Sequence, residues 1–95
     1  MVPAGFSLGQ NYPNPFNPTT TIRFSLPQPG EAELCVYNLL GQRVATLVQG
    51  LQEAGPQVLQ WNGRDEAGRE LASGVYLYRL RAGGQVQTRR LLLLR

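Results

Sequence analysis

The chain has 95 residues and a net charge of +3, from nine arginines and six acids, with no lysine and no histidine. This length allows one domain with a single core and excludes a core that also encloses a deep cleft. The missing histidines exclude Ser-His and Cys-His catalytic arrangements, and the single cysteine excludes an intramolecular disulfide and a Cys/His metal site.

An extended segment rich in proline opens the chain, and we call residues 1–18 the N-terminal arm. Proline fixes φ and disfavours helix in the residue before it, so the arm is predicted to be rigid and irregular. Its prolines after residue 10 are Pro13, Pro15 and Pro18. Tyr12 and Phe16 are its apolar anchors, and we expect both to pack on the edge of the folded domain. The arm is interpreted as a linker remnant that packs on a domain predicted over residues 19–95.

Apolar and polar residues alternate in most of the segments that follow, and this alternation predicts half-buried strands. Residues 19–26 alternate well, with Ile22, Phe24 and Leu26 on one face. In the next strand Cys35 lies among apolar residues, so a buried or half-buried thiol is expected. The predicted strands are 19–26, 31–38, 42–48, 57–61, 70–72, 75–81 and 85–94.

Glycines mark the turns between these strands. Gly41 is expected to take the left-handed conformation, and residues 82–84 are expected to form a hairpin turn. The strand 42–48 departs from alternation, which predicts a β-bulge, and a polar connection is expected over 49–55. About seven short strands with turn signals roughly every 8–12 residues are typical of an immunoglobulin-like antiparallel β-sandwich, so the predicted fold class is all-β.

The aromatic residues of the later strands admit a structural and a ligand-binding interpretation. Trp61 shares a face with Leu59, which favours a core position over a sugar-stacking platform. The segment from Ala72 to Tyr76 has the spacing of a tyrosine corner, in which the phenol bonds back to the backbone just upstream. For Tyr76 and Tyr78 this structural role is favoured over a ligand-binding one.

The sequence holds no constellation of catalytic residues, and the chain is predicted not to be an enzyme. Asn62, Asp65 and Glu66 could supply oxygen ligands to a loop calcium. Their spacing matches no EF-hand, so a solvated hairpin is favoured and no metal or cofactor is predicted. The arginines are scattered and no aromatic residues alternate with a dense basic run, so no nucleic-acid partner is predicted.

Four motifs, in order, resemble the type A C-terminal sorting domain of the type IX secretion system, and the related flagellar hook-capping Ig-like domain has similar motifs. The motifs span residues 10–20, 36–44, 61–65 and 72–80. The likeness runs over nearly the whole chain, with Gln57 where the family often has histidine and Asn62 where it often has aspartate. The residues that match its structural positions are Tyr12, Pro13, Asn14, Pro15, Phe16, Asn17, Pro18, Gly41, Trp61, Gly63, Gly74, Tyr76 and Tyr78.

The resemblance implies a delivery role, with the protein secreted or held at the cell surface of a Gram-negative bacterium. The outer-membrane secretion machinery would read the domain after a covalently linked N-terminal cargo domain has reached the periplasm, directed there by an export signal upstream of Met1. A sortase would then cut upstream of the domain. The terminal signal that the resemblance implies consists of Thr88, Arg89, Arg90, Leu91, Leu92, Leu93, Leu94 and Arg95.

Two interpretations of the final strand stay open. If its edge is exposed, a receptor can add a strand to it, and Arg89, Arg90 and Arg95 can steer an acidic partner. Alternatively, residues 85–94 close a sheet and their arginines are solvated. An open sheet edge could also pair two copies of the domain into a weak homodimer.

Two rival functions accompany the sorting role. One is a structural Ig-like spacer or hook-cap-like assembly module, which would use the same fold and motifs. The other, less favoured, is a carbohydrate-binding appendage, which needs exposed aromatic residues on one face. The candidates for that face are Trp61, Tyr37 and Tyr12.

Overall fold

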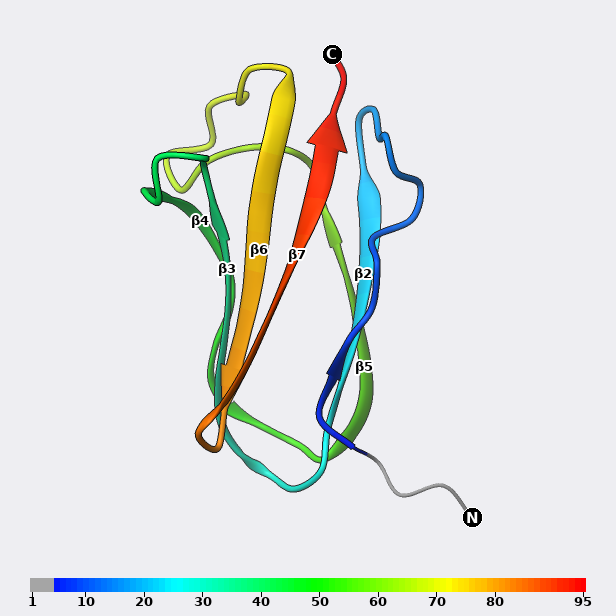
Figure 1. Cartoon of the computed structure of the whole chain (residues 1–95), viewed down its shortest axis with the longest axis vertical. Coiled ribbons are helices and arrows are strands. Elements are labelled where there is room, and N and C mark those ends of the chain that lie inside the picture. The colour runs from blue at the N-terminus through cyan, green and yellow to red at the C-terminus, as the bar shows by residue number, and fades with distance from the viewer. Residues whose placement is uncertain (1–4) are drawn as a thin grey trace.

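A computed structural model describes residues 5–95, and residues 1–4, where the N-terminal arm begins, lie outside the described residues. Two antiparallel sheets pack face to face (Figure 1), with seven strands and no helix among the described residues. The prediction of an all-β, immunoglobulin-like sandwich is confirmed. The strands are β1 (Ser7–Leu8), β2 (Thr20–Leu26), β3 (Gly30–Tyr37), β4 (Arg43–Gln52), β5 (Gly55–Trp61), β6 (Gly74–Ala82) and β7 (Gln85–Leu93).

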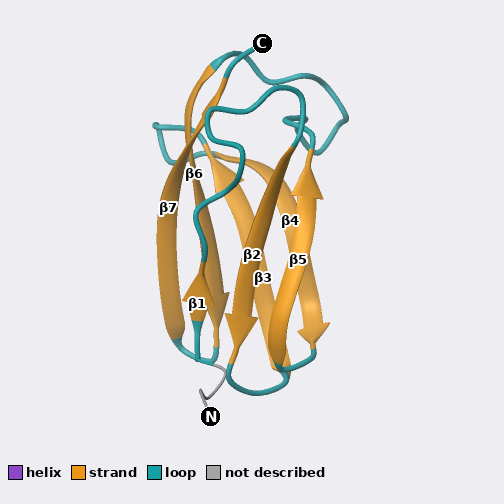
Figure 2. Cartoon of the chain, turned by 90° about the vertical axis from the view of Figure 1, so that its right-hand side faces the viewer, coloured by secondary structure: helices purple, strands orange, loops and turns teal. Residues whose placement is uncertain are grey.

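The order of strands decides which edges the sandwich presents. One sheet has the order β1-β2-β5 and the other β4-β3-β6-β7. Figure 2 shows β1 and β7 on one side of the sandwich and β5 and β4 on the other. The N-terminal arm leaves β1, which pairs with β2, and continues upward between β2 and β7. The arm therefore bridges the two sheets on one side only.

Alternation along each strand directs one face of each sheet into the core, as the sequence predicts. In β2 the side chains of Ile22, Phe24 and Leu26 are all buried. The buried apolar residues that form the core cluster are Leu8, Phe16, Ile22, Phe24, Leu26, Ala32, Leu34, Val36, Ala45, Trp61, Tyr76, Tyr78, Leu80, Leu91 and Leu93. The cluster includes residues from both the arm and β7, so these two segments complete the core.

The expected polar connection over 49–55 is wrong. β4 has ten residues and ends at Gln52, its part from Val48 to Gln52 pairs with β3 without a register shift, and β5 begins at Gly55. Gln49 and Leu51 are exposed on the outer face of this edge strand. One face of an antiparallel sheet can be solvated, so polar residues there do not break the strand.

The expected strand over 70–72 is also wrong. Only an isolated bridge joins this segment to Arg64. The Asp65 carboxylate accepts hydrogen bonds from the backbone N–H groups of Ala67 and Arg69, both at 2.9 Å, and this folds the stretch into a tight loop. The remaining strand of the sandwich is β1, in the N-terminal arm.

The expected bulge and the buried thiol are both confirmed. The register between β3 and β4 shifts after Leu34 and again after Val36. Cys35 is 1% exposed, and its sulfur lies 3.9 Å from the Thr46 hydroxyl oxygen. In the turn that joins the two strands, Gly41 has the expected positive φ, of 84°.

Candidate functional site

The residues predicted to form a terminal signal lie on or just after β7, an edge strand of the four-stranded sheet. Successive side chains of a strand point to opposite faces. Leu91 and Leu93 point into the core and are 1% and 0% exposed, whereas Thr88 and Arg90 are exposed. The signal is therefore divided between residues that hold the fold together and residues that face solvent.

The upper part of β7 is paired with the N-terminal arm. Phe16 donates its backbone N–H to the Leu92 carbonyl at 3.0 Å and accepts the N–H of Leu94 at 3.1 Å. The side-chain oxygen of Asn14 accepts the N–H of Leu92 at 2.9 Å. Phe16 is 1% exposed, and its ring lies 5.7 Å from the ring of Trp61. The arm thus continues the sheet beyond β7 and inserts a core side chain as it does so.

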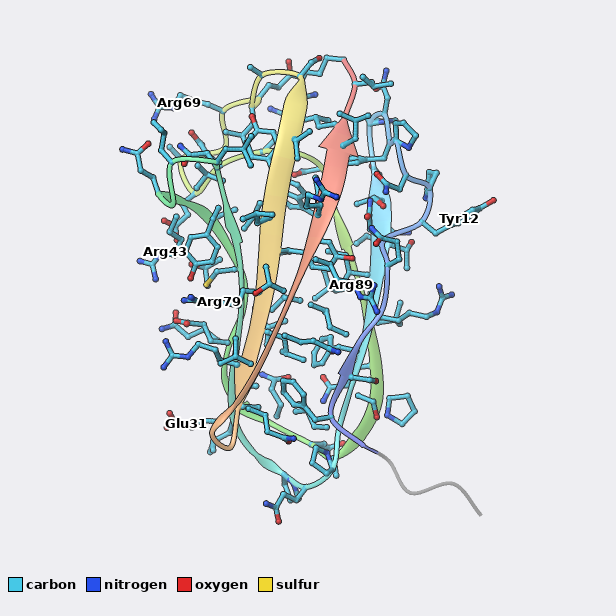
Figure 3. The ribbon with its side chains drawn as sticks, viewed as in Figure 1. Tyr12, Glu31, Arg43, Arg69, Arg79 and Arg89 are labelled. Atoms are coloured by element: carbon cyan, nitrogen blue, oxygen red, sulfur yellow. The ribbon has the colours of Figure 1, made fainter. Side chains whose placement is uncertain are left out.

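The lower part of β7 holds β1 through side chains rather than through backbone pairing. Arg89 lies between β7 and β1 (Figure 3) and donates its Nε–H to the Leu8 carbonyl. Leu8 donates its N–H to the side-chain oxygen of Gln87 at 2.6 Å. The Gln10 side chain then donates to the Arg90 carbonyl at 2.7 Å. We call these contacts, together with those at Phe16 and Asn14, the arm–β7 clasp.

Tyr78 anchors the arm from the core side. Its hydroxyl donates to the Gly9 carbonyl at 2.6 Å and accepts the Asn11 N–H at 2.8 Å. Asn11 is itself 2% exposed, and its side-chain amide donates to the Thr20 hydroxyl at 3.0 Å. Burial raises the pKa of the Tyr78 phenol, and the hydrogen bond from Asn11 opposes that rise. The phenol is therefore held neutral where it can both donate and accept.

Arg95 is fixed against the loop over residues 62–73. Its guanidinium donates to the Leu71 carbonyl at 2.6 Å and to the Gly63 carbonyl at 2.5 Å, and it pairs with the Glu70 carboxylate at 3.7 Å. Gly63 is buried beneath this guanidinium, where a Cβ atom would lie 2.9 Å from its Nη2. A glycine at this position therefore lets the end of β7 approach the loop.

These contacts bear on the two interpretations of the final strand. The upper part of β7 is not an exposed edge open to strand addition, because the arm already pairs with Leu92 and Leu94. Two of the three arginines expected to steer a partner, Arg89 and Arg95, donate to backbone carbonyls of the same chain. Arg90 keeps an exposed side chain. The contacts of the clasp residues Gln10 and Gln87 could not be recognised in the sequence, since their partners lie about 80 residues away.

The aromatic residues divide in the same way between core and surface. Trp61 belongs to the core, as expected, and its indole N–H donates to the Arg64 carbonyl at 3.1 Å. Tyr76 donates to the Ala72 carbonyl at 2.7 Å, which is the expected tyrosine corner. Tyr12 was expected to pack on the edge, but it is 74% exposed and projects away from the sandwich (Figure 3). The neighbouring side chain of Asn11 points inward and is 2% exposed, so in this extended segment the ring of Tyr12 points outward.

Tyr37 lies on the outer face of the four-stranded sheet beneath an arginine. The Arg79 guanidinium stacks 4.8 Å from the Tyr37 ring centre and donates to its hydroxyl at 2.8 Å. With Trp61 buried, the three aromatic residues considered for sugar stacking do not form a common platform.

The loop over residues 62–73, which contains Asp65 and Glu66, is held by hydrogen bonds within the loop. Backbone N–H groups of Arg69 and Ala67 and the Arg69 guanidinium surround the Asp65 carboxylate and hold its pKa below the usual value, against some desolvation. Within residues 5–95, no three His, Cys, Asp or Glu side chains come together as a metal-ligand set. The same part of the chain contains no helix long and apolar enough to cross a membrane.

The fold and these motifs agree with a known domain family. The family model of the FlgD Ig-like domain matches residues 12–85, from the arm to the first residue of β7. The chain belongs to this family. A comparison with curated proteins gave no match.

Three solved structures are similar to this FlgD-type Ig-like domain. Dimeric latent PorU from Porphyromonas gingivalis matches 99% of this chain and 10% of its own, with a TM-score of 0.75 and 18% identity. PorZ, described as an essential surface component of the type-IX secretion system of P. gingivalis, matches 96% of this chain and 12% of its own, with a TM-score of 0.59 and 19% identity. FlgD from P. aeruginosa matches 78% of this chain and 61% of its own, with a TM-score of 0.61 and 26% identity. The chain thus spans about a tenth of PorU and PorZ, and at these identities those two likenesses show the fold alone.

Proposed function

We propose that this domain is a non-catalytic C-terminal sorting and anchoring module. It directs a covalently linked N-terminal cargo protein through a type IX secretion system to the cell surface of a Gram-negative bacterium. The secretion machinery is its partner, and a sortase acts on the chain upstream of it. No cofactor takes part.

One observation carries this proposal, and it concerns β7. The family match ends at residue 85, and the likeness to FlgD covers 78% of the chain. The likeness to PorZ covers 96% of the 95 residues, so it leaves out only about four residues and takes in most of the arm and β7. The arm–β7 clasp therefore falls in the part of the fold shared with a protein of the type-IX secretion system, which supports a sorting role.

The outward face of β7 is the surface that a receptor of the folded domain would read. Thr88 and Arg90 alternate with the side chains that face inward, and both are exposed. Arg90 is also well placed for an acidic receptor, because residues 74–95 contain five arginines and no acid. Leu91 and Leu93 are accessible only when β7 leaves the core, so they serve the fold rather than recognition.

Placement relative to the cargo tests the proposal. A passenger protein with its own export signal is expressed in a bacterium with a type IX system in three arrangements. It is fused before the domain, fused after the domain, or expressed without the domain. We expect surface delivery only when the domain follows the passenger. If the passenger fused before the domain stays in the periplasm, the sorting role is refuted.

The recognition surface is tested separately with charge reversals that leave the core intact. Arg90→Glu is expected to lower surface delivery, while Arg23→Glu, an exposed arginine on the outer face of the other sheet, leaves it unchanged. Deleting residues 88–95 is not a suitable test, because it removes Leu91 and Leu93 from the core. Equal delivery by both variants would exclude Arg90 as a contact.

A structural Ig-like spacer or hook-cap-like assembly module is the second candidate. The family match and the 26% identity to FlgD from P. aeruginosa favour it. A spacer holds its neighbours in place whatever its position in the chain. In the fusion experiment it would therefore leave the passenger in the same compartment with the domain before it, after it, or absent.

A further inference from the structure

β5 presents backbone groups that no described residue pairs with, and the pairing of β2 identifies them. Thr21 exchanges both backbone hydrogen bonds with Tyr12, and the Arg23 carbonyl accepts the Gly9 N–H. The backbone groups of these two β2 residues therefore point toward the arm and away from β5. In an antiparallel pair, hydrogen-bonded and non-hydrogen-bonded residues alternate.

The consequence for β5 follows from the register. Gln60 lies opposite Thr21 and Val58 lies opposite Arg23, so both belong to non-hydrogen-bonded pairs. Their N–H and C=O groups are directed to the outer edge of β5. Pro56, two residues earlier, adds a carbonyl to the same edge but no N–H. Pro56, Val58 and Gln60 are alternate residues of β5. Together they offer three backbone carbonyls and two backbone N–H groups along this edge.

The other long edges are each partly occupied or irregular. The arm–β7 clasp bonds the backbone of β7 from Arg90 to Leu94, and the Gln87 and Arg89 side chains hold β1 beside its lower part. β4 is interrupted by the two register shifts with β3, and the Glu66 N–H already donates to its Val44 carbonyl at 3.1 Å. Among the strands that the structure describes, β5 is the long edge that keeps its register over its full length and has none of its outward backbone groups bonded to another segment.

β5 lacks most of the features that keep an edge strand from pairing with another chain. Natural edge strands are usually guarded by charges, inward-pointing lysines or bulges. The sequence of Gly55–Trp61 contains no charged residue, and its pairing with β2 runs without a shift. Val58 is 62% exposed at its middle. Only Pro56 guards the strand, and it guards one end.

We propose that β5 pairs with β5 of a second copy of this chain, antiparallel about a two-fold axis, so that two three-stranded sheets become one six-stranded sheet. An edge whose donors and acceptors recur every second residue is complementary to its own antiparallel copy. An uncharged edge brings no like charges together in such a pair. The contact is isologous, so it closes at two subunits.

Position in the molecule favours a second copy over a segment of the same chain. Residues 5–18 of the N-terminal arm lie on the β1–β7 side, opposite β5 (Figure 2). This segment therefore leaves the β5 edge accessible. The inference does not depend on the sorting role, because it rests only on the edge.

Sedimentation equilibrium over a range of concentrations tests the pairing. The apparent mass is expected to rise from 10.5 kDa toward about twice that value as concentration increases. Gln60→Pro removes an edge donor without touching the bonds to β2, and proline is tolerated where its N side faces solvent. Val58→Lys places like charges at the centre of the pair. Both variants are expected to stay monomeric, and at concentrations where the wild type is also monomeric they should keep its thermal unfolding curve.

Val86→Lys is the matched control, since Val86 is 57% exposed on β7. It is expected to dimerise like the wild type. Amide exchange gives a second readout, with the Val58 and Gln60 amides becoming protected at high concentration and the Leu59 amide unchanged. A mass that stays at 10.5 kDa, or equal loss of dimer in Val58→Lys and Val86→Lys, overturns the proposal. Protection of Val58 and Gln60 that appears only in a longer chain would also overturn it, because another segment would then fill the edge.

Discussion

At the scale of single residues, one hydroxyl group connects the core to the arm. Tyr78 is 0% exposed, yet its phenol reaches the backbone of Gly9 and Asn11, which lie nearly seventy positions earlier. Buried tyrosines usually find such a partner, because an unpaired hydroxyl in the core is costly. Here the partners are backbone groups of an irregular segment that has little regular pairing of its own.

Replacing Tyr78 by phenylalanine should therefore destabilise the domain. The change leaves a buried N–H at Asn11 and a carbonyl at Gly9 without their partner, which costs about 1–3 kcal/mol of unfolding free energy. Urea denaturation followed by Trp61 fluorescence measures the loss. Tyr37→Phe serves as the control, because Tyr37 is only half-buried and its removal should stay within about 0.5 kcal/mol. Equal losses in the two variants would contradict this role of Tyr78.

The buried phenols also predict alkaline sensitivity. Burial raises the pKa of both Tyr76 and Tyr78, so the folded state keeps protons that the unfolded state releases near pH 10. Fewer protons bound in the unfolded state mean that the unfolding free energy falls as pH rises past about 10. The chain has no lysine, whose titration would overlap. Urea denaturation between pH 9.5 and 11 should show this fall, and a smaller one in Tyr78→Phe.

Gly63 and Gly68 have similar positive φ values but different surroundings. Comparing them distinguishes the conformational cost of a side chain from the cost of close packing. Gly63 has φ of 73° and lies beneath Arg95 and Leu93, whereas Gly68 has φ of 82° and open space around it. Alanine at either position meets the left-handed penalty of about 1–2 kcal/mol. Gly63→Ala should lose about 0.5–1.5 kcal/mol more, because its Cβ would displace the Arg95 guanidinium from its hydrogen bond to the Gly63 carbonyl. Thermal unfolding of the two variants compares them directly, and a Gly68→Ala variant that is the less stable would refute the packing argument.

At the scale of elements, the arm is held by one aromatic residue and not by two. Phe16→Ala should cost about 3–5 kcal/mol, because it empties a site that is closed by Trp61 and by the backbone of β7. Tyr12→Ala removes an exposed ring from the same motif and should stay within about 0.5 kcal/mol. Chemical denaturation of both variants measures the difference. Similar losses would mean that Tyr12 packs in solution.

Periodicity predicted the strands whose two faces have different surroundings, and it did so for physical reasons. β2 and β6 alternate because one face packs in the core and the other meets solvent. It could not predict β1, which has two residues, nor the end of β4, where Gln49, Gly50 and Gln52 resemble a loop. Periodicity also could not predict that Phe16 is buried and Tyr12 is exposed. The burial of Phe16 depends on its contacts with Trp61 and β7, which lie far away in the sequence.

The candidate site shows the same limit. The alternation of Thr88 and Arg90 with inward-facing residues could be anticipated from the strand itself. The use of Arg89 and Gln87 as ligands of β1 could not, because no local pattern encodes a contact between residues about 80 positions apart. Long-range polar contacts of this kind are set by how two sheets meet, and the sequence of either strand alone does not contain that information.

At the scale of the whole molecule, the sandwich depends on β7 for its core and for its closed side. A chain that stops after Gln87 loses Leu91, Leu93 and the backbone that pairs with Phe16. It should show no cooperative unfolding transition, because two buried leucines and the docking of the arm are lost together. A chain that lacks only Arg95 should keep the transition at a lower midpoint. Circular dichroism during heating distinguishes the two, and a cooperative transition in the shorter chain would refute this dependence.

The clasp between the arm and β7 also sets an order of events during synthesis. Leu8 is made 81 residues before Arg89, its partner, so the arm can pair with β2 early but cannot dock on β7 until almost the whole domain has left the ribosome or a translocation channel. The core is therefore completed late, and a nascent chain interrupted before β7 lacks Leu91 and Leu93 and stays open to proteases. Translation errors that shorten the domain are in this way turned into degradation rather than into a partly working product.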